Sequence, residues 1–226
     1  MGGMASDSPE GTGRPAGTGP PSNAAFRALD RRDPLLGRAR RRLAPFPVFP
    51  DTGQGGSHFH ALSRAIIFQQ LAGAAARTIH DRVAGLTPGK RFPTAQQIVS
   101  LSDAKLRGAG LSAGKLAALR DLSARSLDGR LRLRSIGRRS DEDVIDELVE
   151  VRGIGRWTAQ MFLMSRLARL DILAPDDLGL REGAKRLDGL GERPTPKELE
   201  ARGEVWAPLR SVASWVLWRV SEEPQP

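Results

Sequence analysis

The sequence contains no cysteine. This absence excludes disulfide bonds, a catalytic thiolate, cysteine-bound zinc and cysteine-bound iron–sulfur clusters. Histidine is nearly as scarce, since the chain has only His58, His60 and His80. His58 and His60 have the spacing of half a zinc site, but a satisfied or exposed histidine pair before a helix is the more common meaning. We therefore predict no metal site.

Long apolar runs are also absent. No stretch approaches the roughly 18 to 20 apolar residues that a membrane-spanning helix requires. Residues 1–22 are rich in glycine, proline and serine and lack the apolar segment of a signal peptide, so we expect a disordered tail. These absences predict a cytoplasmic, nucleoid-associated protein that does not bind membranes.

Basic residues outnumber acidic ones, 35 to 26, which gives a net charge of +9 and a pI near 11.1. This balance suits an anionic partner such as nucleic acid, although other classes of basic protein share it. A chain of 226 residues is long enough for one large domain or two small lobes with a core.

Helical signals dominate the chain. Residues 23–42 form a basic amphipathic pattern that Pro34 interrupts, and residues 57–85 predict a helical pair. Between residues 92 and 127, Thr94 with Gln97 predicts a capping box, and further serine caps precede apolar positions at helical spacing. Strand signals are few, so we predict an all-α fold.

The most informative stretch is residues 140–187. Ser140 predicts the N-cap of a short helix, and Gly153 and Gly155 permit a tight hairpin. A second helix begins around Arg156, so the free N–H groups of its first turn point toward whatever the hairpin meets. That arrangement binds phosphate.

Gly153-Ile154-Gly155 alone leaves two interpretations open. One is a helix-hairpin-helix that binds a nucleic-acid backbone, and the other is a simple corner between two helices. The chain continues with Pro175-Asp176-Asp177, which opens a further helix, and this continuation favours the first interpretation through the resemblance that it carries.

With Gly153-Ile154-Gly155-Arg156-Trp157-Thr158-Ala159 followed by Pro175-Asp176-Asp177, the chain resembles the helix-hairpin-helix (HhH-GPD) DNA glycosylase superfamily, in its alkylpurine or 3-methyladenine branch. The resemblance covers roughly residues 59–219. It implies a two-lobed helical domain over residues 23–226, with the hairpin motif near 143–167 and no N-terminal sheet domain.

The resemblance also implies roles for individual residues. Asp177 is implied as the catalytic carboxylate, and Leu71 as an apolar wedge that fills the gap left by a flipped base, although a core leucine is an alternative. Leu209 is implied beside the base pocket, while Trp206, Trp215 and Trp218 are core residues by default. The implied DNA contacts are Gly153, Gly155, Arg156, Thr158, Gln70, Leu71 and Arg210.

The chemistry of N-glycosidic cleavage agrees with these residues. The sugar becomes oxocarbenium-like, so the enzyme mainly needs a fixed negative charge beside C1′ and a water molecule. Asp177 fits that task at a helix start, and we predict Asp176 as the N-cap of that helix. A single sequence does not prove which aspartate does which job.

An alkylated purine carries a positive charge and departs readily, so an aromatic wall is useful. Trp157 and Met161 lie four residues apart and share one helix face, and with Phe68 and Leu209 they are the predicted base pocket. For Met161, a core position is equally compatible with the pattern.

Bifunctional relatives carry a Schiff-base lysine at the motif position that Trp157 occupies. The chain's lysines all lie outside the motif, at Lys90, Lys105, Lys115, Lys185 and Lys197. We therefore predict a monomeric, monofunctional glycosylase that excises alkylated purines such as 3-methyladenine and 7-methylguanine from double-stranded DNA. It needs no cofactor, although the family is compatible with a monovalent cation at the hairpin carbonyls. A glycosylase for deaminated or oxidised bases and a non-catalytic DNA-damage binding module remain alternatives.

Overall fold

A computed structural model describes residues 21–43, 56–89 and 91–224. These residues form α-helices and two 3-10 helices without a β-strand, which confirms the predicted fold class. The elements are α1 (Asn23–Arg32), α2 (Pro34–Arg42), α3 (His58–Phe68), α4 (Gly73–Ala84), α5 (Ala95–Ser100), α6 (Asp103–Gly108), α7 (Ala113–Asp128), η1 (Ile136–Arg138), α8 (Asp141–Val149), α9 (Arg156–Ser165), α10 (Leu178–Asp188), α11 (Pro196–Gly203), η2 (Glu204–Trp206) and α12 (Arg210–Glu222). None of these helices is long and apolar enough to cross a membrane.

Several helix starts lie where the sequence predicts them. Pro34 separates α1 from α2, and Thr94 with Gln97 forms a complete capping box at α5. The hydroxyl of Ser140 accepts a hydrogen bond from the backbone N–H of Asp143 at the start of α8. The predicted disorder of residues 1–22 lies almost wholly outside the described residues.

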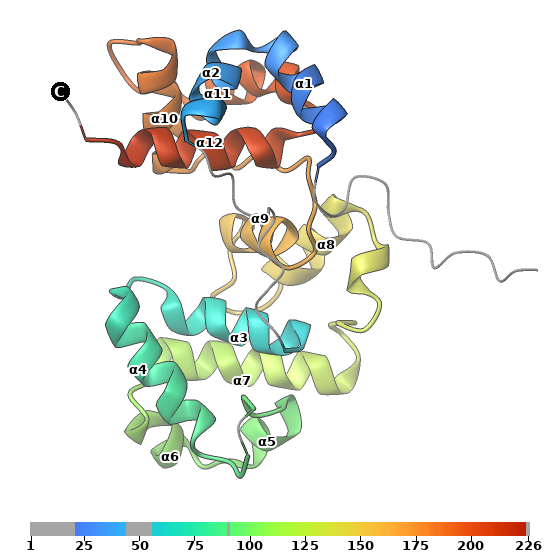
Figure 1. The fold of residues 1–226 in the computed structure, drawn as a ribbon. Helices are drawn as coiled ribbons and strands as arrows, with labels where there is room; N and C mark the ends of the chain where they lie inside the picture. Colours follow the sequence, from blue (N-terminus) through green and yellow to red (C-terminus); the bar gives the residue numbers. More distant parts are fainter. Residues whose placement is uncertain (1–20, 44–55, 90, 225–226) are drawn as a thin grey trace, which may run out of the picture.

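The helices form two lobes joined by the hairpin motif (Figure 1). Helices α3 to α7 make one lobe, and α1, α2, α10, α11 and α12 make the other. Helices α8 and α9 lie between them. The buried apolar side chains nevertheless form one continuous cluster that includes residues of both lobes. The motif therefore sits where both lobes can contribute to a site.

Helices α10 and α12 approach each other unusually closely. A Cβ atom at Gly183 of α10 would lie only 2.0 Å from the carbonyl oxygen of Leu217 on α12. No larger residue fits there without moving one helix, so glycine at this position sets how near the two helices pack. The contact fixes α12 against the helix that follows the Pro-Asp-Asp turn.

Asp33 is a buried carboxylate at the junction of α1 and α2. It caps α2 through the N–H of Leu36 at 3.0 Å, and it accepts from Trp206 Nε1 at 2.7 Å and Arg202 Nη2 at 2.5 Å. Burial acts to raise the pKa of Asp33, but these hydrogen bonds outweigh it and the pKa lies below its ordinary value. Asp33 therefore links the junction of α1 and α2 to η2, the 3-10 helix before α12.

Replacing Asp33 with alanine should destabilise the protein by about 2 kcal/mol or more, because it removes the cap of α2 and leaves the buried Trp206 N–H without an acceptor, while Arg202 keeps only its pair with Asp188. Since the pKa of Asp33 is lowered by folding, its contribution is present above the unfolded pKa of about 3.9 and is lost as the pH falls through the lower folded value. Urea unfolding at neutral pH and at pH 3 measures both effects. Asp128→Ala, which removes an exposed ion pair with Arg130, is the control and should have little effect.

Candidate active site

The hairpin between α8 and α9 is held from inside the protein. Ile154 is buried, and the N–H of Arg152 donates to Asp121 Oδ2 at 2.8 Å. Gly153 has a φ of +79°, and a Cβ there would lie 3.2 Å from Ala118 Cβ. Glycine at position 153 is therefore required by the fold of the hairpin itself.

Gly155 differs from Gly153. Its backbone is extended, with φ −94° and ψ 172°, and a Cβ atom would meet nothing within 4 Å. It is the N-cap of α9 and provides no side-chain capping hydrogen bond. The first turn of α9 thus presents uncapped N–H groups beside open space, which is the geometry of a phosphate site.

Asp177 is the N-cap of α10. Its Oδ1 accepts from the backbone N–H of Leu180 at 2.9 Å. The prediction that Asp176 is the cap is therefore wrong; the helix starts one residue later than that assignment requires, and Asp176 is exposed. Capping and the catalytic role implied by the resemblance fall on the same carboxylate.

Two indole N–H groups also donate to Asp177. Trp157 Nε1 lies 2.6 Å from Oδ2, and Trp218 Nε1 lies 3.1 Å from Oδ1. The Trp157 contact brings the motif helix α9 to the Pro-Asp-Asp turn. The Trp218 contact was missed, because a tryptophan near the C-terminus gives no sign of its partner.

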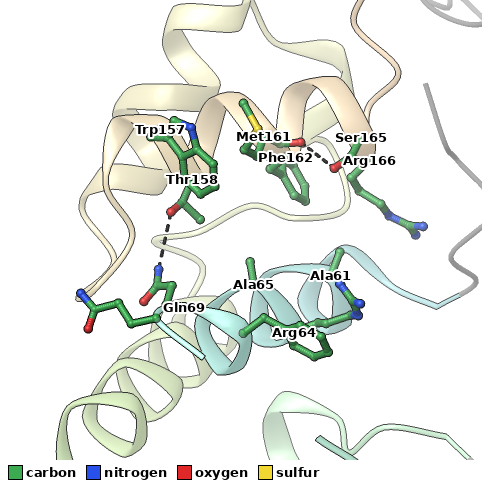
Figure 2. A pocket seen from close by; sticks show the side chains of 12 residues that line it. Ala61, Arg64, Ala65, Gln69, Trp157, Thr158, Met161, Phe162, Ser165 and Arg166 are labelled. Atoms are coloured by element: carbon green, nitrogen blue, oxygen red, sulfur yellow. Dashed lines mark hydrogen bonds between the residues drawn. The ribbon is translucent and has the colours of Figure 1, made fainter. Parts of the chain in front are cut away.

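A cavity of about 620 Å³ lies between α3 and α9. Figure 2 shows Trp157, Thr158 and Met161 on the α9 side and Ala61, Arg64 and Ala65 on the α3 side. Phe68 also lines it. Trp157 is 48% exposed, so its ring is a wall of this cavity as well as a neighbour of Asp177.

The structure brings Trp157, Met161 and Phe68 together around this cavity, but not Leu209. Leu209 is buried in front of α12 and lines a different cavity, with Ala25 and Pro208 among its neighbours. Its position depends on how α1 packs against the turn before α12. That packing is not visible in the sequence.

Arg64 is a lining residue that the sequence analysis missed. Its guanidinium carbon lies 3.9 Å from the centre of the Phe68 ring. Burial, together with the charge of Arg77, lowers the pKa of Arg64. The i, i+4 spacing of Arg64 and Phe68 was a usable signal, because it puts both on one helix face.

The turn between α3 and α4 carries the predicted wedge. Leu71 is 39% exposed, so it is not a core residue, and Gln70 has a φ of +54°. Gln69, which the sequence analysis did not select, donates from Nε2 to the Gly153 carbonyl at 2.8 Å and lies 3.5 Å from Thr158 Oγ1. These contacts join the wedge turn to the hairpin and to the first turn of α9, and Figure 2 shows the one between Gln69 and Thr158.

The two predicted arginine contacts are already paired. Arg156 donates to Glu142 at 2.8 Å, and Arg210 makes two 2.8 Å hydrogen bonds to Asp171. The exposed Arg156 pair is readily exchanged for a phosphate. These hydrogen bonds to the Asp171 carboxylate raise the pKa of Arg210, and they tether α12 to the segment before Pro175.

The histidines have protein partners. His60 Nε2 lies 2.9 Å from His80 Nε2, and His58 Nδ1 accepts from Arg166. Within the described ranges, no group of three or more metal-ligating side chains could hold a metal ion.

The comparisons with known proteins agree with this geometry. Residues 63–208 match the model of the HhH-GPD superfamily of base excision DNA repair proteins. DNA-3-methyladenine glycosylase 1 of Schizosaccharomyces pombe is 33% identical over 165 residues, which cover 73% of this chain and 72% of that protein.

Two solved structures are similar over most of the chain. A DNA-3-methyladenine glycosidase from Bacillus halodurans matches with a TM-score of 0.77 at 33% identity, over 88% of this chain and 89% of that one. A 3-methyladenine DNA glycosylase from Schizosaccharomyces pombe in complex with abasic DNA matches with a TM-score of 0.76 at 30% identity, over 87% and 96%. With its hairpin, its capping Asp177 and a family match over well over half its length, the chain belongs to the HhH-GPD superfamily of base excision DNA repair proteins.

Proposed function

We propose that this chain is a monofunctional DNA glycosylase that binds double-stranded DNA and hydrolyses the N-glycosidic bond of alkylated purines, with Asp177 as its catalytic carboxylate. The observation that carries the proposal is the contact of Asp177 with Trp157, because it puts a carboxylate at the edge of a cavity large enough for a base. The names of the related proteins point to the same class of substrate.

DNA binding begins at the hairpin. The uncapped N–H groups at the start of α9 bind a phosphate next to the lesion, and the open space at Gly155 lets the backbone approach. Leu71 enters the stack from the turn beside the hairpin and fills the gap left by the flipped nucleotide. Its exposed apolar side chain has that role only when DNA is present.

Bond cleavage depends on charge. A cationic alkylpurine stacks against Trp157 in the cavity, where the polarizable thioether of Met161 also lies. As the bond to the base breaks, the Asp177 carboxylate stabilises the positive charge that develops on the sugar and orients the attacking water.

The residues that line the cavity support a monofunctional mechanism. No lysine is among the described residues that line the cavity. Lys115, whose pKa burial lowers, donates instead to the Ile67 carbonyl at 2.7 Å. Among the described residues that line the cavity, none therefore offers an amine for a Schiff base with the sugar.

The two alternatives differ from this proposal in specific features. A binding module without chemistry leaves the placement of Asp177 unexplained. A glycosylase for deaminated or oxidised bases gains some support from Arg64, because a guanidinium in the wall favours a base with an acceptor oxygen over a cationic one. Measuring release from a panel of lesion duplexes separates the three.

Two smaller predictions stay proposals. A monovalent cation at the hairpin is one; the Gly153 carbonyl already accepts a hydrogen bond from Gln69, so such a cation would use other carbonyls. Association with the nucleoid is the other, and it rests on the substrate alone.

Replacing Gly155 with leucine should weaken binding to damaged and undamaged duplexes alike, by about tenfold, because the side chain blocks phosphate from backbone N–H groups that contribute roughly 1.5 kcal/mol each. The fold should survive, since a Cβ there contacts nothing. Fluorescence anisotropy at several salt concentrations measures the binding. Gly191→Leu, also at an open position, is the control, and a loss confined to damaged DNA would contradict the phosphate role.

Asp177→Asn should bind lesion DNA but lose at least about a hundredfold in single-turnover rate, because it removes a preorganised charge. Asparagine caps a helix nearly as well as aspartate, so thermal unfolding should change little. Asp176→Asn, at an exposed position that caps nothing, is the matched control and should keep the wild-type rate. Equal rates for the two variants would exclude the proposed role of Asp177.

The abasic product should remain an intact strand after base release, and borohydride should trap no covalent complex, because no lysine amine among the described residues faces the cavity. Gel analysis of the reaction with and without borohydride is the measurement. A trapped adduct that requires Lys115 would show that a lysine reaches the sugar after all.

A further inference from the structure

Trp218 contacts the proposed catalytic carboxylate from α12, the helix that packs against α10. Its Nε1 donates to Asp177 Oδ1 at 3.1 Å, although 41 residues separate the two in the chain. The side chain is half-buried on α12 and is not among the residues that line the cavity. Its polar atom therefore has a partner in the site, although its ring is not part of the wall of this cavity.

Glycines on α10 make this contact possible. A Cβ at Gly179 would lie 3.0 Å from Trp218 Cδ1 and 3.1 Å from Asp177 Oδ1. One turn later, Gly183 lets the Leu217 carbonyl approach α10. Alanine at position 179 would press on both partners of the hydrogen bond, so the close packing of α10 and α12 is what brings the indole to the carboxylate.

The two oxygens of Asp177 are unequally occupied. Oδ1 accepts two hydrogen bonds, from Leu180 N and Trp218 Nε1, and these use both of its lone pairs. Oδ2 accepts one, from Trp157 Nε1. Because Trp157 also lines the cavity, Oδ2 is the oxygen that is hydrogen-bonded to a cavity residue.

We propose that Trp218 is a positioning residue that locks Asp177 Oδ1 and thereby holds Oδ2 toward the cavity as the oxygen that stabilises the sugar. The terminal torsion of aspartate is soft. Without Trp218, only the Leu180 N–H would hold Oδ1, and the donor to Oδ2 would be Trp157, whose side chain is exposed. A second donor on the same oxygen sets the rotation before substrate binds, so the charge needs no reorganisation during the reaction. This inference rests on the proposed catalytic role of Asp177.

Trp218→Phe tests the proposal, because it removes the donor and keeps an aromatic ring. The single-turnover rate of base release from a 7-methylguanine duplex should fall by about tenfold or more. Binding to a duplex with an abasic-site analogue should stay within about twofold, since Trp218 contacts no DNA in this scheme. Trp215→Phe, three residues earlier on the same helix, is the matched control and should keep both values.

A double-mutant cycle separates positioning from packing. If Trp218 acts through the charge of Asp177, Trp218→Phe should lower the single-turnover rate little further in an Asp177→Asn background. If the two residues act independently, the double mutant should show the product of the two single losses of rate. A wild-type rate for Trp218→Phe, or a full second loss in the double mutant, overturns the proposal. If instead Asp177→Asn itself keeps the wild-type rate, the proposed function fails, and that outcome is distinct.

Gly179→Ala provides a second route that leaves Trp218 and Asp177 chemically intact. It displaces the indole from Oδ1 by crowding. The single-turnover rate of base release should therefore fall, whereas the rate of the Trp215→Phe control should not. Thermal unfolding identifies any variant that does not fold. If either Trp218→Phe or Gly179→Ala fails to fold, the single-turnover rate of the other variant tests the proposal. An unchanged rate in Gly179→Ala, with the indole shown by crystallography to have moved, overturns the role of Trp218.

Discussion

The hydrogen bond from Leu180 N to Asp177 is the interaction on which the site depends. The first turn of any helix has N–H groups without intrahelical acceptors, and an N-cap side chain satisfies one of them. Here that side chain is the carboxylate proposed to perform the chemistry. Its position is therefore set by the start of α10, which the packing of α10 against α12 holds in turn. Local capping and long-range packing both act on one group.

Much of the fold could be predicted because its signals are local. Capping residues, the proline between α1 and α2 and the glycines of the hairpin each act within a few residues of themselves. The hairpin and the carboxylate also occur at a spacing that identifies a family. Element type and the motif were therefore accessible from sequence alone.

The errors and omissions share a different cause. Asp176 and Asp177 both suit an N-cap, and choosing between them needs the helix start to within one residue, which sequence does not resolve. Leu209, Trp218 and Gln69 are placed by contacts between distant segments. Their residue types are equally compatible with a core or surface position, so no local pattern distinguishes their roles.

The hydrogen bond from Gln69 to the Gly153 carbonyl has a mechanical consequence. It joins the turn that carries Leu71 to the hairpin, although 84 residues separate Gln69 from Gly153 in the chain. On a duplex, a wedge tied in this way to the phosphate-binding hairpin would stay at a fixed offset from the phosphate that the hairpin holds. Such a wedge would reach the base stack without a separate closing motion.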